Sequence, residues 1–236
     1  MNKRIFCLPL SLHFIVTGIV SAQNKSAGNN LSVWKGISTQ PADSAQTTYF
    51  NLGILSTMNR LNGVGFNAFG SVIGGNMNGI QFSGLANMVG GSMRGVQLSG
   101  ISNINGNNMV GLSATGLVNI AGNQSKGVLL SGMTSISGDN TSGVMASGIM
   151  NISGDGASGV HLAGLANITG ATFNGVTAGG LLNVIGEHLN GVQISGFANI
   201  VASRMNGVQI GLGNYATKAK GVQIGLVNYY KNEMKG

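Results

Sequence analysis

The stretch GVQLSGISNINGNNMV, residues 95–110, is followed by GLSATGLVNIAGNQSK, residues 111–126, and the two carry glycines, one Asn and apolar residues at matching places. With the first glycine as position 1, position 2 is aliphatic in every such unit, and position 7 is large and apolar. Position 1 is glycine every sixteen residues, at Gly63, Gly79, Gly95, Gly111, Gly127, Gly143, Gly159, Gly175, Gly191 and Gly207, and again at Gly221 after fourteen. A fixed period of this length indicates a repeat architecture in which each unit packs mainly against its neighbours.

Two all-β architectures fit this period. In a parallel β-solenoid each unit is one coil, and about twelve coils stack about 4.8 Å apart. In an antiparallel up-and-down β-barrel each unit is one strand with its turn. No proline follows Pro41, as expected where every N–H enters a hydrogen-bonded ladder. The turns also resemble one another from unit to unit. We therefore predict a parallel β-solenoid with a 16-residue period, and the barrel is the alternative.

The pattern within a unit predicts which side chains face the core. Positions 2 and 4 share one side of a strand, and a corner at positions 5 and 6 would turn position 7 into the same interior. Position 9 is predicted to form a structural ladder of stacked amides, made of Asn87, Asn103, Asn119, Asn151, Asn167, Asn183 and Asn199. Position 3 is predicted to face outward as a partner surface that includes Gln97, Leu129, Met145, His161 and Gln193.

Positions 4 and 8 alternate in size with a period of two units. Position 4 runs Leu98, Ala114, Leu130, Ala146, Leu162, Ala178 and Ile194. Position 8 runs Ser102, Val118, Thr134, Met150, Ala166, Leu182 and Ala198. A large residue at one position therefore accompanies a small residue at the other. In antiparallel strands the two positions would be neighbours, whereas in a solenoid the pattern is interpreted as volume compensation inside a packed core.

The chain divides into three segments. Lys3 and Arg4 precede an apolar stretch at residues 5–20, and small residues follow before Gln23, so residues 1–22 are predicted to be a cleaved signal peptide. Residues 23–46 are polar and unrepeated, and we interpret them as a linker or an irregular N-terminal cap. Residues 47–236 form the predicted β repeat domain.

The residue types needed for chemistry are scarce. The single cysteine, Cys7, lies in the predicted signal peptide, so the mature chain lacks thiols. Asp139 and Asp155 occupy the same position in adjacent units, but Ca²⁺ requires six to eight oxygen ligands. The two histidines of the mature chain match no metal spacing, and its scattered charges form no basic stripe for nucleic acid. We predict no catalytic, cofactor-binding or metal site, no enzymatic activity and no nucleic-acid partner.

The closing units, GVQIGLGNYATKAK (207–220) and GVQIGLVNYYKNEMKG (221–236), resemble the GVQIGLVN-type glycine-rich surface repeats exported by Gram-negative bacteria, including Bacteroidetes and spirochaetes. The similarity covers most of residues 47–236. It implies a location in the periplasm, the outer membrane or the cell surface, and it brings no catalytic residues.

These observations predict a non-enzymatic exported scaffold that binds an unidentified protein or glycan partner at the envelope, or that acts as a spacer. An outer-membrane barrel or pore-like protein is the alternative function. Residues 221–236 keep the pattern of an interior unit, so we expect either end-to-end self-association through them or a longer parent chain.

Overall fold

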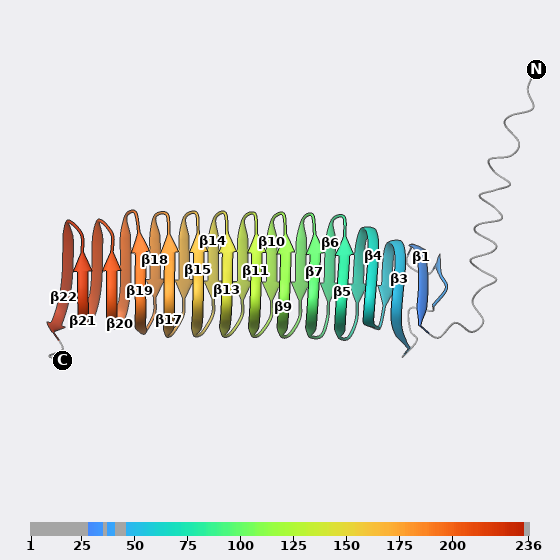
Figure 1. Ribbon diagram of the computed structural model, residues 1–236, viewed down its shortest axis with the longest axis horizontal. Coiled ribbons are helices and arrows are strands. Elements are labelled where there is room, and N and C mark those ends of the chain that lie inside the picture. Colours follow the sequence, from blue (N-terminus) through green and yellow to red (C-terminus); the bar gives the residue numbers. More distant parts are fainter. Residues whose placement is uncertain (1–27, 35–36, 41–45, 234–236) are drawn as a thin grey trace, which may run out of the picture.

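The computed structural model describes residues 28–34, 37–40 and 46–233, which form a straight rod of β-strands with no helix in these ranges (Figure 1). The predicted signal peptide, residues 1–22, lies outside the described residues, as do parts of the predicted linker or cap. In that segment β1 (Asn29–Trp34) pairs in parallel with β3 (Thr47–Met58), and β2 (Ile37–Ser38) pairs antiparallel with β1.

The strands of the rod follow one another in a regular series. Their bounds are β1 (Asn29–Trp34), β2 (Ile37–Ser38), β3 (Thr47–Met58), β4 (Arg60–Ile73), β5 (Met77–Ser83), β6 (Ala86–Val89), β7 (Met93–Ser99), β8 (Ser102–Asn105), β9 (Met109–Thr115), β10 (Val118–Ala121), β11 (Ser125–Ser131), β12 (Thr134–Ser137), β13 (Thr141–Ser147), β14 (Met150–Ser153), β15 (Ala157–Ala163), β16 (Ala166–Thr169), β17 (Phe173–Gly179), β18 (Leu182–Ile185), β19 (His188–Ser195), β20 (Ala198–Ile210), β21 (Gly213–Ile224) and β22 (Val227–Glu233).

Each strand of the repeats pairs in parallel with the strand one unit later. Val128 lies opposite Val144, and Asn151 lies opposite Asn167, so from β4 to β20 residues pair across sixteen positions. The register shifts only in the pairs β3–β4 and β20–β21 among these repeat strands. The protein is thus an all-β parallel solenoid of about twelve coils with a 16-residue period, which confirms the predicted fold. The antiparallel alternative is wrong because these pairings are parallel.

A coil has two strands, two outer faces and two edges. The longer strand, such as β11, carries positions 15 to 5, and its outward side forms face A, made of positions 2 and 4. The shorter strand, such as β12, carries positions 8 to 11, and its outward side forms face B, made of positions 8 and 10. The corner around positions 5–7 is called the glycine edge, and the segment of positions 12–16, which includes the start of the longer strand, is called the charged edge.

The two sides of the longer strand are the reverse of those predicted, whereas position 9 on the shorter strand faces inward as predicted. Positions 3, 9, 11 and 15 point inward, and the predicted outward column at position 3 is at most 1% exposed at Gln97, Leu129, Met145, His161 and Gln193. Leu130 and Leu162, predicted as core residues at position 4, are 39% and 43% exposed, and Leu117 at position 7 is also exposed. Successive residues of a strand alternate sides, so an error in one position reverses the whole set.

Glycine at position 1 permits the close stacking of coils. Gly127 has a φ of 122°, which L-residues rarely adopt. A Cβ atom on Gly127 would lie 2.1 Å from the carbonyl oxygen of Gly111 in the preceding coil. The recurrence of glycine therefore reflects backbone packing along the rod axis.

Candidate interaction surface

The buried amides at position 9 hold the corner at the glycine edge. The Nδ2 of Asn167 donates to the carbonyl oxygen of Ala178 at 2.8 Å and to the Oδ1 of Asn183 at 2.9 Å. Asn151 and Asn183 make the same two bonds to the next coil. Each amide thus satisfies a carbonyl of position 4, where the chain leaves the strand, and this need explains a polar interior beside the corner.

Between Asn103 and Asn119 the hydroxyl of Ser113 connects the two amides. Asn103 donates to the Oγ of Ser113 at 3.0 Å, and this hydroxyl donates in turn to the Oδ1 of Asn119 at 2.6 Å. Asn119 donates to the carbonyl oxygen of Leu130 at 2.6 Å. Asn87 and Asn199 resume the regular pattern toward either end of the rod. All seven residues of the predicted ladder are buried.

The column at position 3 packs inside the rod, and its variation follows the space available. The Nε2 of Gln97 donates to the Oε1 of Gln81 at 3.3 Å, and Gln209 donates to Gln193 at 2.9 Å. Leu129 and Met145 occur in coils where positions 11 and 15 are small hydroxyl residues that bond one another, namely Ser125 with Ser137 and Thr141 with Ser153. The apolar residues at position 3 therefore fill interior volume and are unavailable to a partner.

His161 occupies the same interior column. Its ring makes an edge-to-face contact with Phe173, with centroids 5.0 Å apart. Desolvation by burial lowers the pKa of His161 from 6.5 to about 4. The imidazole is therefore neutral near pH 7 and acts as a packed side chain in the rod.

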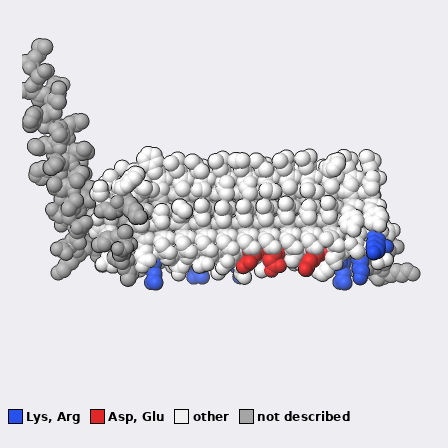
Figure 2. Space-filling model, turned by 180° about the vertical axis from the view of Figure 1, so that it is seen from behind, with Lys and Arg blue, Asp and Glu red and all other residues white. Residues whose placement is uncertain are grey.

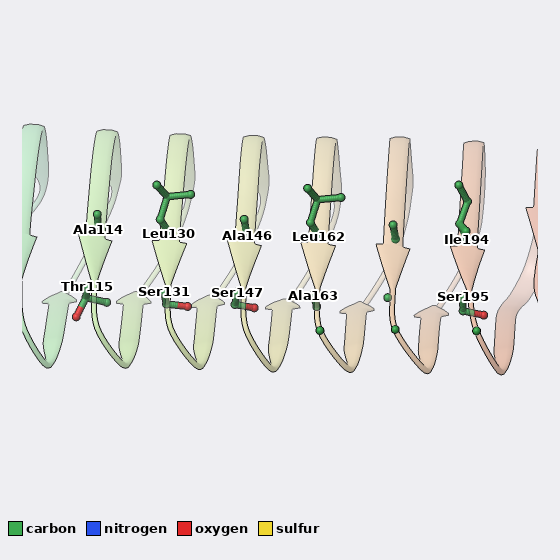
Figure 3. A pocket seen from close by; sticks show the side chains of 15 residues that line it. Ala114, Thr115, Leu130, Ser131, Ala146, Ser147, Leu162, Ala163, Ile194 and Ser195 are labelled. Carbon is green, nitrogen blue, oxygen red and sulfur yellow. The ribbon is translucent and has the colours of Figure 1, made fainter.

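The two outer faces carry the aliphatic residues. Positions 2 and 10 are mainly Val and Ile, and none of these side chains is fully buried. On face A a shallow groove of about 860 Å³ follows positions 4 and 5 from coil to coil. Figure 3 shows Leu130, Leu162 and Ile194 projecting into this groove, with Ala114 and Ala146 between or beside them. The outer faces are thus flat, apolar and corrugated with a period of two coils.

Charged side chains collect along one edge of the rod (Figure 2). From Arg60 to Lys220, the Lys, Arg, Asp and Glu residues all fall at positions 12–16. The acidic residues lie together in the middle of this edge with basic residues on either side, so the edge carries mixed charge. In the described ranges, no group of three or more His, Cys, Asp or Glu residues is placed to hold a metal ion. In these same ranges, no helix is both long and apolar enough to span a membrane.

The fold and these faces define a β-solenoid with an amide-rich interior, apolar flat outer faces and one charged edge. Comparisons with protein-family models, with curated proteins and with solved structures found no match to this chain. The interpretation of the surface therefore rests on its own geometry.

Face A and face B do not follow from the sequence pattern as a candidate surface, because aliphatic residues at regular positions predict a core. The signal that could have found them is the size alternation at positions 4 and 8. That alternation was assigned to core packing, but none of these residues from Leu98 to Ala198 is fully buried.

Proposed function

We propose that the protein is a non-enzymatic, exported repeat scaffold at the envelope or surface of a Gram-negative bacterium, where its flat faces dock a partner or hold structures apart. The observation that carries this proposal is the outward placement of aliphatic residues on both faces along the rod. Exposed apolar patches larger than a few hundred Å² mark interaction surfaces in proteins.

The energetics favour a covered face. Full burial of one Val, Leu or Ile side chain contributes about 1.5–3 kcal/mol. Leu130, Leu162 and Ile194 on face A each remain more than one third exposed in the single chain. A partner that covers a row of such residues would gain several such contributions, and the aliphatic lining suits a protein surface better than a glycan.

The export part of the proposal rests on the sequence. Lys3 and Arg4 followed by an apolar stretch are typical of a signal peptide, and the closing units resemble exported surface repeats. The solenoid fold is compatible with this function. Since the fold is a solenoid, the barrel or pore-like alternative is not carried further.

Expression of the full chain in a Gram-negative host, followed by fractionation and mass spectrometry, tests the export. We expect a mature chain that begins at Gln23, with Lys126 and Lys218 on the exposed charged edge accessible to a membrane-impermeant amine reagent once the outer membrane is permeabilised. The matched control, Lys3→Glu with Arg4→Glu, removes the positive n-region and should leave an unlabelled precursor in the cytoplasm. A wild-type chain that keeps Met1 and stays in the cytoplasm would contradict the proposal.

A further inference from the structure

The sizes of the side chains on the two faces are matched, coil by coil, in a way that one molecule does not use. Where face A carries Leu130, face B of the same coil carries Thr134. In the next coil face A carries Ala146, and face B carries Met150. The match holds in seven consecutive coils, as Leu98 with Ser102, Ala114 with Val118, Leu130 with Thr134, Ala146 with Met150, Leu162 with Ala166, Ala178 with Leu182 and Ile194 with Ala198.

Packing inside the rod cannot produce this match. Positions 4 and 8 point outward on opposite faces, and the buried columns at positions 3 and 9 lie between them. A Leu on face A therefore does not compete for space with the residue at position 8 of its own coil. Complementary sizes have a physical effect only where the two residues meet, and that requires face A of one molecule against face B of another.

We infer that the partner of these faces is a second copy of this chain, stacked with its face B on face A of the first and with its coils in register. Both positions lie two residues from the corner glycine at position 6, so in such a stack position 4 of one copy meets position 8 of the next at the same height. Leu162 would then enter the space above Ala166 of the next copy, and Met150 of that copy would enter the space above Ala146. Interdigitation of this kind between flat sheets gives close packing.

The register of the stack follows from the alternation. A shift by one coil would place Leu130 against Met150 and Ala146 against Ala166, which brings large residues together and leaves gaps between small ones. A shift by two coils restores the match. Because the large side chains recur every two coils, a partner surface must repeat with the same spacing of about 9.6 Å, twice the strand spacing. A second copy has this spacing by construction.

The size of the interface is sufficient. Nine coils at about 4.8 Å and the four-residue strands of face B at about 3.3 Å give a contact of roughly 43 by 13 Å. The two copies together then bury roughly 1,100 Å², above the about 1,000 Å² that a specific protein interface needs. The straight rod in Figure 1 presents these faces without visible twist, which permits contact along the full length. Each copy in the stack contributes two sheets, and neighbouring sheets lie about 10 Å apart, so the charged edges of adjacent copies would lie about 20 Å apart. This distance exceeds the screening length of about 8 Å, so the charges on adjacent edges would interact weakly.

This inference rests on the proposed function, in which the two faces dock a partner. It adds that the partner is a second copy of the chain. Purified protein tests it independently of export. The residues from Gln23 onward, studied by sedimentation velocity without detergent, should form species whose mass grows with concentration. Ala146→Leu fills a hole on face A and should weaken association by about tenfold or more. Ala146→Leu with Met150→Ala should restore association, although the two residues lie on opposite faces of one molecule.

A second pair of substitutions tests the same packing in case the first pair impairs folding. Leu162→Ala with Ala166→Leu exchanges knob and hole, and the double variant should associate more tightly than Ala166→Leu alone. Asp139→Asn, in the exposed turn between β12 and β13 and outside both faces, is the control and should associate like the wild type. A wild type that stays monomeric at high concentration, an Ala146→Leu variant that associates normally, or a double variant that is not restored would each overturn the inference. Binding of the monomer to lipid vesicles in place of self-association would overturn it as well.

Discussion

At the scale of single residues, Asn119 illustrates what the sequence could and could not predict. The recurrence of Asn at position 9 predicts a buried amide column, because a polar side chain at a fixed place in every coil can bond along the axis. The recurrence does not reveal the main hydrogen-bond acceptor of these amides. The Nδ2 of Asn119 bonds the carbonyl oxygen of Leu130, a backbone group that becomes visible only once the path of the corner is known. The hydroxyl of Ser113, which bridges to Asn103, was missed for the same reason.

His161 provides a residue-scale prediction with a defined pH window. Burial lowers its pKa from 6.5 to about 4, so between these values the unfolded chain binds a proton that the folded protein does not. The free energy of unfolding should therefore fall as the pH drops from about 6.5 toward 4, by about 2–3 kcal/mol at about 1.4 kcal/mol per pKa unit. Urea titrations at pH 7 and pH 4.5 measure this difference.

The matched control for His161 is its replacement by Gln, the residue that occupies the same buried position at Gln193 and Gln209. His161→Gln should lose this part of the pH dependence and keep the remainder, which comes from the carboxylates. An unchanged pH dependence in His161→Gln would show that the buried imidazole does not contribute to it.

At the scale of the structural element, the period, the parallel pairing and the number of coils could be predicted from the spacing of glycines. The sides of the longer strand could not be predicted in this way. Alternation divides a strand into two sets of residues, and the usual rule that aliphatic residues lie inside chose the wrong set. In this narrow coil the interior must also satisfy corner carbonyls, so Asn and Gln lie inside while Val128 and Leu130 face outward.

Glycine at position 1 gives the element-scale prediction. Gly127→Ala should reduce the free energy of unfolding by about 3 kcal/mol or more, because the added Cβ requires an unfavourable φ and collides with the backbone of the preceding coil. Gly74→Ala is the control, since its Cβ would have only the Oδ1 of Asn59 nearby, at 3.9 Å. Thermal unfolding should show a large loss for the first variant and a change within about 0.5 kcal/mol for the second. Equal losses would mean that coil spacing is not limited at position 1.

At the scale of the whole molecule, the outer edge of β22, the last strand among the described residues, leads to a prediction of a second mode of association. Among the described residues β22 pairs with β21 alone, and Tyr230, which lies opposite the fully buried Ala216, is 46% exposed at this end. We predict that rods join end to end through residues 221–236, and that high salt favours the joint by screening Lys218, Lys220 and Lys231. Small-angle scattering distinguishes this mode, which lengthens the particle, from face-to-face stacking, which thickens it.

A lysine added at the end should oppose this joint. Tyr230→Lys should shorten the particles at every salt concentration, while Val128→Lys, placed on face A far from the end, should leave the length unchanged. Particles whose length responds neither to salt nor to the end variant would rule out end-to-end association.

The two-coil alternation on the faces also constrains how the gene can change in length. Loss or duplication of one sixteen-residue coil preserves the fold, since every strand finds an equivalent neighbour, but it reverses the order of large and small residues beyond the junction. Loss or duplication of two coils preserves both the fold and that order. Removal of residues 127–158 therefore leaves a shorter rod with intact faces, whereas removal of residues 127–142 leaves a rod whose two halves are out of step. Natural length variants of such a chain should accumulate in pairs of repeats.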